Sequence, residues 1–282
     1  MLRSETHSVQ CGFTLVETVV VIAITGILSA VVARFIVAPV QGYLSTQARA
    51  ALVDQADLAL RRIGRDLRIA LPNSARVTAS GLGLELVPTT GAARYVTEAS
   101  NRLQFGSVAT SFDLIGPALT LTAGQDLAFY NLGSGIVGSD VYADNTSAAA
   151  QASANRRSST NGAGAASTIT MSSAAGLPVA AFAAPYRVFA VEPPVSYRCD
   201  LATGRLTRYQ GYGFLATQPD PPVTGTNAVL ASGVSACRFS YDAAVLASRA
   251  ALVTLALTLQ TTTSSGAESV TLHHALHVDN LP

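Results

Sequence analysis

Glu17 occupies the position in this chain that most needs a chemical explanation. It is the only charged residue in the apolar run from Phe13 to Val32. A carboxylate near the start of a membrane helix is costly unless it stays hydrated at the headgroup level or gains a cationic partner. The residues alone leave both interpretations of Glu17 open.

Three histidines near the C-terminus could in principle ligate a metal. If they lie on a strand, His273 and His277 share a face but are roughly 13 Å apart, at ~3.3 Å per residue. They cannot chelate one ion alone, and His274 points to the other face, toward the expected core. We therefore predict no metal site, with His274 satisfied in the sheet and the other two at the surface.

The segment Gly133–Gly138 fits the G-x-G-x-x-G pattern. A dinucleotide site needs a helix to begin there, and the following SDVYADNT is not helical, so we expect a glycine-rich turn. No Ser/His/Asp set lies in a nucleophile context such as G-x-S-x-G. We predict no catalytic residue, no cofactor and no enzymatic activity.

Charge gives little support for nucleic-acid binding, because 18 basic residues balance 17 acidic ones. Asp57 and Asp66 lie at helical pairing distance from a basic cluster, so a solvated ion-pair face is a better explanation than phosphate binding, and no nucleic acid is expected. The cluster consists of Arg61, Arg62, Arg65 and Arg68.

The chain has three cysteines. Cys11 lies ahead of the apolar run, whereas Cys199 and Cys237 lie in β-like segments of the C-terminal region. In an exported domain such a pair is a disulfide candidate, and two buried free thiols are the alternative.

The N-terminus indicates the compartment. A run of about 20 apolar residues is long enough to span a bilayer as a helix. No small-residue cleavage site follows the run, as a secretory signal would require. A lipoprotein signal is excluded because Cys11 precedes the run. The later apolar segment 252–259 is too short to span, and it alternates as a strand does.

We expect the helix to continue beyond the membrane, over residues 13–71, with a transmembrane part 13–33 and a soluble part 41–71. Pro39 and Gly42 predict a kink or a locally unwound stretch, and Leu71-Pro72-Asn73 ends the helix. An apolar stripe at helical spacing should face a globular domain. It comprises Leu44, Ala48, Ala51, Leu52, Gln55, Leu58, Ala59, Ile63, Leu67 and Ala70.

Residues 72–282 read as short strands and turns, which predicts an α+β class with an antiparallel sheet on the helix. Residues 143–176, rich in Ala, Ser, Thr, Asn and Gly, predict an exposed low-complexity loop. The expected strands are 75–79, 82–87, 94–97, 102–105, 127–131, 186–191, 195–199, 205–210, 234–241, 251–260 and 268–278.

The hexapeptide Gly12-Phe13-Thr14-Leu15-Val16-Glu17 resembles the class III signal of type IV prepilins and type II secretion pseudopilins. The resemblance implies the pilin fold and cleavage after Gly12 by the prepilin peptidase, which removes leader residues 1–12. It also implies N-methylation of Phe13 and pairing of Glu17 with the N-terminal amine of a neighbouring subunit during assembly.

Later motifs resemble the minor pilins of the mannose-sensitive haemagglutinin (MSHA) pilus system and, in kind, J-type pseudopilins. Two features depart from the family pattern: no Lys/Arg cluster adjoins Gly12, and 143–176 matches nothing in it. The motifs that carry the resemblance are Arg34-Phe35-Ile36, Ala70–Arg76, Pro194–Cys199, Thr203–Tyr209 and His277–Pro282.

The resemblance implies a structural subunit in pilus initiation or at the pilus tip. Its partners would be the prepilin peptidase, other pilins, the inner-membrane assembly platform and membrane lipid. The N-terminus would be cytoplasmic and the C-terminal domain periplasmic, before passage into an extracellular filament. The alternatives are a type II secretion pseudopilin, or a tip adhesin or DNA-uptake module.

Overall fold

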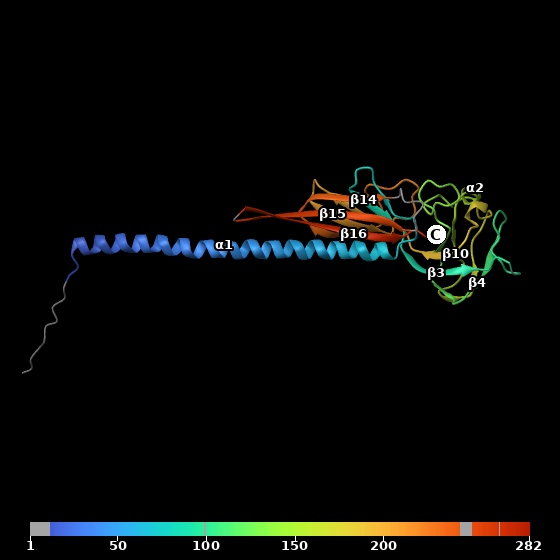
Figure 1. Ribbon diagram of the computed structural model, residues 1–282, viewed down its shortest axis with the longest axis horizontal. Helices are drawn as coiled ribbons and strands as arrows, with labels where there is room; N and C mark the ends of the chain where they lie inside the picture. Colours follow the sequence, from blue (N-terminus) through green and yellow to red (C-terminus); the bar gives the residue numbers. More distant parts are fainter. Residues whose placement is uncertain (1–11, 99, 243–249, 265) are drawn as a thin grey trace, which may run out of the picture. The chain divides into compact units, whose positions relative to one another are not determined.

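The computed structural model describes residues 12–98, 100–242, 250–264 and 266–282 (Figure 1). Cys11 and the rest of the predicted leader up to that residue lie outside the described residues. One long helix, α1 (Leu15–Arg68), is followed by strands whose described pairings are antiparallel, which confirms the predicted α+β class. Two short helices, α2 (Ala148–Gln151) and η1 (Val179–Ala181), lie among the strands.

Within the described residues the strands form four sheets. The five-stranded sheet has the order β1 (Arg76–Val77), β2 (Gly83–Leu86), β11 (Val195–Asp200), β12 (Arg205–Gln210), β13 (Thr226–Ser232). The six-stranded sheet has the order β7 (Arg156–Ser158), β6 (Asp126–Phe129), β10 (Arg187–Val191), β3 (Thr89–Tyr95), β4 (Ser111–Ile115), β9 (Thr168–Thr170). The remaining two are β14 (Val234–Asp242), β15 (Ala250–Thr263), β16 (Gly266–Asp279), and the pair β5 (Leu119–Leu121), β8 (Gly164–Ala166).

The chain forms two compact units. The first contains residues 1–50 and 262–268, and the second contains residues 51–261 and 269–282. Within the second unit the main core joins the last five turns of α1 to the five- and three-stranded sheets. As alternation predicted, Val253, Leu255, Leu257 and Leu259 of β15 all face this core.

The apolar stripe on α1 is rotated relative to the prediction. Leu60 is buried, whereas Leu58, which we expected to face the core, is 68% exposed. Ala51 is also exposed and Ala56 is buried. The buried face therefore overlaps the predicted stripe and is shifted toward Ala56 and Leu60. The stripe residues that are buried as predicted are Leu52, Ala59, Ile63 and Leu67.

The helix runs through Pro39 and Gly42 without interruption, so the predicted unwound stretch is wrong. Proline removes a single intrahelical bond, the one that its own nitrogen would make to the Phe35 carbonyl. The hydroxyls of Ser45 and Thr46 both donate to the Gly42 carbonyl, at 3.0 and 2.8 Å, so the chain after the proline stays engaged with the helix backbone.

α1 ends at Arg68, earlier than the predicted end at residue 71. The backbone leaves the helix because the next residues pair with the chain that follows β2. The Ile69 carbonyl accepts from the Thr89 amide at 2.7 Å, and the Leu71 amide donates to the Val87 carbonyl at 2.7 Å. These bonds replace the helical ones.

The six-stranded sheet is an insertion. β2 and β11 are neighbours in the five-stranded sheet, with Leu86 opposite Val195, yet the whole six-stranded sheet lies between them in sequence. It has its own core, built on the packed rings of Tyr95, Phe112 and Phe129. The sequence predicted neither the insertion nor its separate core.

The predicted irregular loop over residues 143–176 is wrong in part, because this segment contains α2, β7, β8 and β9. Arg157 of β7, whose side chain is fully buried, connects the parts of this segment by hydrogen bonds. The Arg157 guanidinium donates to five backbone carbonyls, those of residues 151, 154, 156, 175 and 176, at 2.8–3.2 Å. One cation thus satisfies acceptors that Ala- and Ser-rich chain could not satisfy with its own side chains.

Candidate functional site

The first turn of α1 is built by Thr14 and Glu17. The Thr14 hydroxyl accepts a hydrogen bond from the Glu17 amide at 3.2 Å, so Thr14 caps the helix, which begins at Leu15. Glu17 sits in this first turn, where the positive end of the helix dipole favours a carboxylate. The T-x-x-E pattern of a capping box could have revealed this role from sequence.

The expected scissile bond lies just ahead of the cap. Gly12 and Phe13 precede the helix in non-helical backbone, and both are exposed. No atom lies within 4 Å of where a Gly12 side chain would begin. The peptide bond between them is therefore accessible in the described part of the chain.

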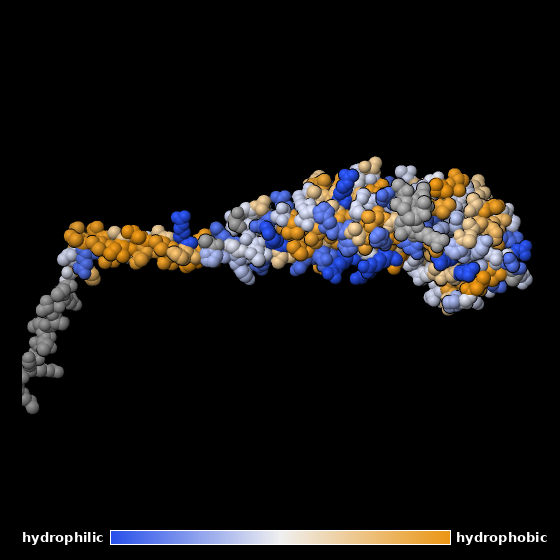
Figure 2. All heavy atoms as spheres, viewed as in Figure 1, coloured by the Kyte–Doolittle hydropathy of each residue, from blue (hydrophilic) through white to orange (hydrophobic). Residues whose placement is uncertain are grey.

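The helix surface after Phe13 is mostly apolar and uncovered. Figure 2 shows this part of α1 as mainly hydrophobic, with a few hydrophilic atoms interrupting it. Phe13 is 80% exposed and Leu15 is 81% exposed, and the most apolar window of the helix has none of its residues buried. By length and composition this helix can cross a membrane, which makes it a candidate anchor.

Further along the same helix, Asp66 is buried and shared by two strands. Its carboxylate accepts from the Tyr197 hydroxyl at 2.6 Å and from the Arg208 Nε at 2.9 Å. Arg62, one turn earlier, forms a longer ion pair with Asp66 at 3.5 Å. Burial, together with the Asp66 carboxylate, raises the pKa of the Tyr197 hydroxyl well above its ordinary value.

This cluster corrects the prediction of a fully solvated ion-pair face. Arg61 and Asp57 do form an exposed pair at 2.6 Å, as predicted. The side chain of Asp66, however, is only 6% exposed, and it faces the sheet. A cleft of about 460 Å³ lies beside it, and Arg62, Glu192 and Arg208 are among the side chains that line it.

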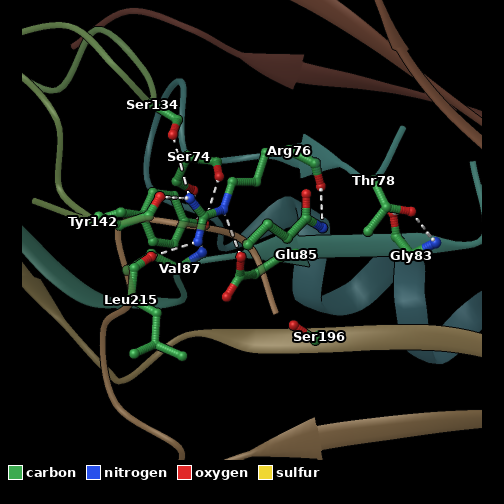
Figure 3. Close-up of polar contacts among 12 residues, drawn as sticks. Ser74, Arg76, Thr78, Gly83, Glu85, Val87, Ser134, Tyr142, Ser196 and Leu215 are labelled. Atoms are coloured by element: carbon green, nitrogen blue, oxygen red, sulfur yellow. Dashed lines mark hydrogen bonds and ion pairs between the residues drawn. The ribbon is translucent and has the colours of Figure 1, made fainter. Parts of the chain in front are cut away.

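A second buried carboxylate, Glu85 of β2, anchors a network that the sequence did not reveal (Figure 3). It accepts from the Arg76 Nε at 2.5 Å and from the Tyr212 hydroxyl at 2.6 Å. Tyr212 also shares a 2.6 Å hydrogen bond with Ser196. Burial raises the pKa of Glu85, and Arg76 and Tyr212 offset only part of that effect.

Arg76 joins three separate segments of the chain. Its guanidinium lies 3.6 Å from the ring centroid of Tyr142 and donates to the Ser134 hydroxyl, as Figure 3 shows. It also donates to the carbonyls of Leu215 and Ala216, each at 2.7 Å. Since both carboxylate oxygens of Glu85 and most Arg76 donors are occupied, this cluster stabilises the fold and offers no free acid or base.

The remaining predicted site residues have these positions. A disulfide joins Cys199 of β11 to Cys237 of β14, and so links the five-stranded sheet to the three-stranded one. His273 and His277 are exposed, and His274 is half-buried on the inner face of β16. Within the described residues, no group of three His, Cys, Asp or Glu could hold a metal.

The glycine-rich segment around Gly133 consists of turns. Gly133, Gly135 and Gly138 all adopt positive φ. The next helix, α2, begins only at Ala148, so no helix N-terminus faces this segment. The predicted glycine-rich turn is confirmed.

An exposed glycine–phenylalanine bond, a capped helix with a first-turn glutamate and an uncovered apolar surface together make the N-terminal segment a candidate membrane anchor. Residues 7–33 match the family described as "Prokaryotic N-terminal methylation motif". The N-terminus is therefore a type IV pilin-like signal of the kind that prepilins and pseudopilins carry. No curated protein and no solved structure matches the chain.

Proposed function

We propose that the protein is a minor pilin, similar to MshO of MSHA-type type IV pili, that acts in pilus initiation or in the tip complex. One observation carries this proposal: the methylation motif at residues 7–33 coincides with a helix whose apolar half is uncovered in the isolated chain. The resemblance of the C-terminal motifs to MSHA minor pilins supports the subclass.

In this proposal a prepilin peptidase removes residues 1–12 and Phe13 becomes the methylated N-terminus. Residues 13–33 hold the subunit in the inner membrane, with the C-terminal domain in the periplasm, until the assembly platform transfers it to other pilins. The Glu17 carboxylate then pairs with the N-terminal amine of a neighbour. A carboxylate tolerates apolar surroundings when such a cation replaces its hydration.

N-terminal mass spectrometry of the membrane-associated protein tests the processing step. We expect a mature chain that begins at methylated Phe13. Gly12→Glu should leave a precursor that retains residues 1–12. Gly42→Glu is the matched control, because Gly42 is also exposed with no atom within 4 Å of its Cβ position. Normal maturation of the Gly12 variant would contradict the assigned cleavage site.

Glu17→Ala tests the assembly step separately. The variant should still be cleaved and methylated but should enter filaments poorly. Thr25→Val is the control, since the Thr25 hydroxyl donates only to the Val21 carbonyl of its own helix. Equal incorporation of the Glu17 variant and the control would remove the pairing role.

A type II secretion pseudopilin is the second candidate, because the same N-terminal observations fit it equally well. The two differ in the machinery that uses the subunit. The genes beside this one distinguish them: pilus-assembly genes favour the pilin, and secretion genes favour the pseudopilin.

A further inference from the structure

The apolar part of α1 carries two charges of opposite sign. Between Phe13 and Val40 the charged residues are Glu17 and Arg34. Both are exposed, and neither forms an ion pair within the described residues. They are 17 residues apart, which is ~25 Å at 1.5 Å per residue, so they cannot pair within one chain.

Arg34 has a partner while the helix is in a bilayer. A span from Phe13 to Val32 fills the ~30 Å hydrocarbon layer, which leaves Arg34 at the far headgroups, where lipid phosphates are available. A helix that leaves lipid for a bundle of parallel apolar helices loses those phosphates. An arginine in such surroundings requires a carboxylate.

The surface beside Arg34 has a shallow, open hollow. An open hollow of about 540 Å³ is lined by Val31, Arg34, Phe35 and Pro39. Pro39 has no N–H, so the Phe35 carbonyl lacks the amide that would normally bond to it four residues on. The hollow therefore combines the Arg34 guanidinium, apolar side chains and the Phe35 carbonyl, which has no hydrogen-bond donor from its own helix.

The first turn of the same helix offers the complementary groups. Glu17 supplies a carboxylate and the adjacent Thr18 supplies a hydroxyl, which in the isolated chain makes only a long 3.3 Å bond to the Thr14 carbonyl. Because Glu17 and Thr18 are adjacent, as are Arg34 and Phe35, one offset of 17 residues aligns both pairs. A parallel helix displaced by ~25 Å thus places Glu17 level with Arg34, and Thr18 level with Phe35.

We propose that the hollow at Arg34 receives Glu17 and Thr18 from a second copy of this chain. The contact rests on the proposed function, because it requires these helices to assemble in parallel outside lipid. It is compatible with the pairing of Glu17 to an N-terminal amine. A carboxylate has two oxygens and about four acceptor positions, so it can serve the amine of one neighbour and the guanidinium of another.

Cysteine crosslinking in the full chain tests the 17-residue offset. Two differently tagged copies, both carrying Cys11→Ser, are expressed together with a prepilin peptidase and the inner-membrane assembly platform, so that the helices can leave lipid. Val16→Cys in one copy pairs with Ala33→Cys in the other to report the proposed contact. Val16→Cys with Val20→Cys reports the four-residue offset that amine pairing requires. Mass spectrometry of the N-terminus records processing in each sample.

Both cysteine pairs should crosslink in the parent. Arg34→Gln should lower the 16–33 crosslink by roughly tenfold or more, as expected for loss of one partner of a desolvated ion pair. The same change should leave the 16–20 crosslink and the methylation of Phe13 intact. Arg34→Lys, which keeps the charge, should restore most of the 16–33 crosslink.

A 16–20 crosslink without a 16–33 crosslink would overturn this contact and leave the proposed function standing. So would a 16–33 crosslink that Arg34→Gln does not change. Absence of both crosslinks would overturn the contact together with the proposed assembly.

Discussion

Asp66 provides the sharpest test of how the sheets are held on α1. Its side chain is 6% exposed, and that of its partner Arg208 is 13% exposed. Asp66→Ala removes the acceptor for both Arg208 and the Tyr197 hydroxyl and leaves a cation without its counter-charge. Breaking a buried ion pair in this way costs about 3–5 kcal/mol of the free energy of unfolding. For a domain of this size the midpoint of thermal unfolding should fall by roughly 10 °C.

The assay is chemical and thermal unfolding of the full chain in detergent, followed by circular dichroism. Asp57→Ala is the matched control: it is the same substitution on the same helix, at an exposed pair with Arg61. It should change the free energy of unfolding by less than about 1 kcal/mol. Asp66→Asn keeps an acceptor for Tyr197 and should lose about 1.5–3 kcal/mol.

A double-mutant cycle then isolates the pair. In Asp66→Leu with Arg208→Met neither charge remains, so the double variant should be more stable than Asp66→Leu alone. If Asp66→Ala costs no more than Asp57→Ala, the carboxylate does not stabilise the contact between helix and sheet, and the reasoning from burial is refuted.

Three further predictions concern the second unit. Replacing both Cys199 and Cys237 by Ala should lower the free energy of unfolding by about 4 kcal/mol, from closure of a 38-residue loop; denaturant titration with and without reductant measures it, and equal midpoints would contradict it. Burial raises the pKa of Glu85 above 4.5, so the folded state binds the Glu85 proton more tightly than the unfolded state does. Acidification from neutral pH to 4.5 should therefore raise the free energy of unfolding of the wild type relative to that of Glu85→Gln. Urea titrations of both proteins across that pH range measure it, and a constant difference between them would refute it. Leu60→Ala should cost about 2–5 kcal/mol and Leu58→Ala less than about 0.5 kcal/mol, and a reversed order would show that the other face of α1 packs on the sheet.

Local patterns explain which parts of the fold could be predicted from sequence. The apolar run of about 20 residues favours a helix, and the period-two alternation from Leu252 to Leu259 favours a strand with one buried face. The N-terminal signal is equally local, since Gly12, Phe13 and Glu17 are consecutive or one turn apart. Each of these features carries its own evidence within a few residues.

The prediction missed β4 and β13 and four strands of three residues each, β5, β7, β8 and β9. β7, β8 and β9 consist mainly of small or polar residues, so they have no such signal. Around β7 the order depends on the Arg157 guanidinium, which donates to carbonyls between residues 151 and 176. The burial of a single arginine in an Ala- and Ser-rich segment cannot be predicted from the local sequence, because arginine is mostly exposed in proteins.

The buried clusters around Asp66 and Glu85 could not be predicted from sequence, because their members lie far apart along the chain. Asp66 meets Tyr197 and Arg208 across 131 and 142 residues, and Glu85 meets Tyr212 across 127. Asp57 and Asp66 each lie four residues from an arginine on the helix, yet Asp66 is buried and Asp57 is exposed. Only the register of the sheet against the helix separates them.

The contrast between Asp66 and Glu17 shows what α1 still lacks in an isolated chain. Both are carboxylates on an apolar helix, where an unpaired charge is expensive once water is removed. Asp66 is satisfied by the chain itself, through side chains that arrive with β11 and β12. Among the described residues the Glu17 carboxylate has only the helix dipole, because the Thr14 cap binds the Glu17 amide, and the surface around it is uncovered. Removing that surface from water must therefore bring a cation from another molecule, which is why assembly, and not folding, is where Glu17 should matter.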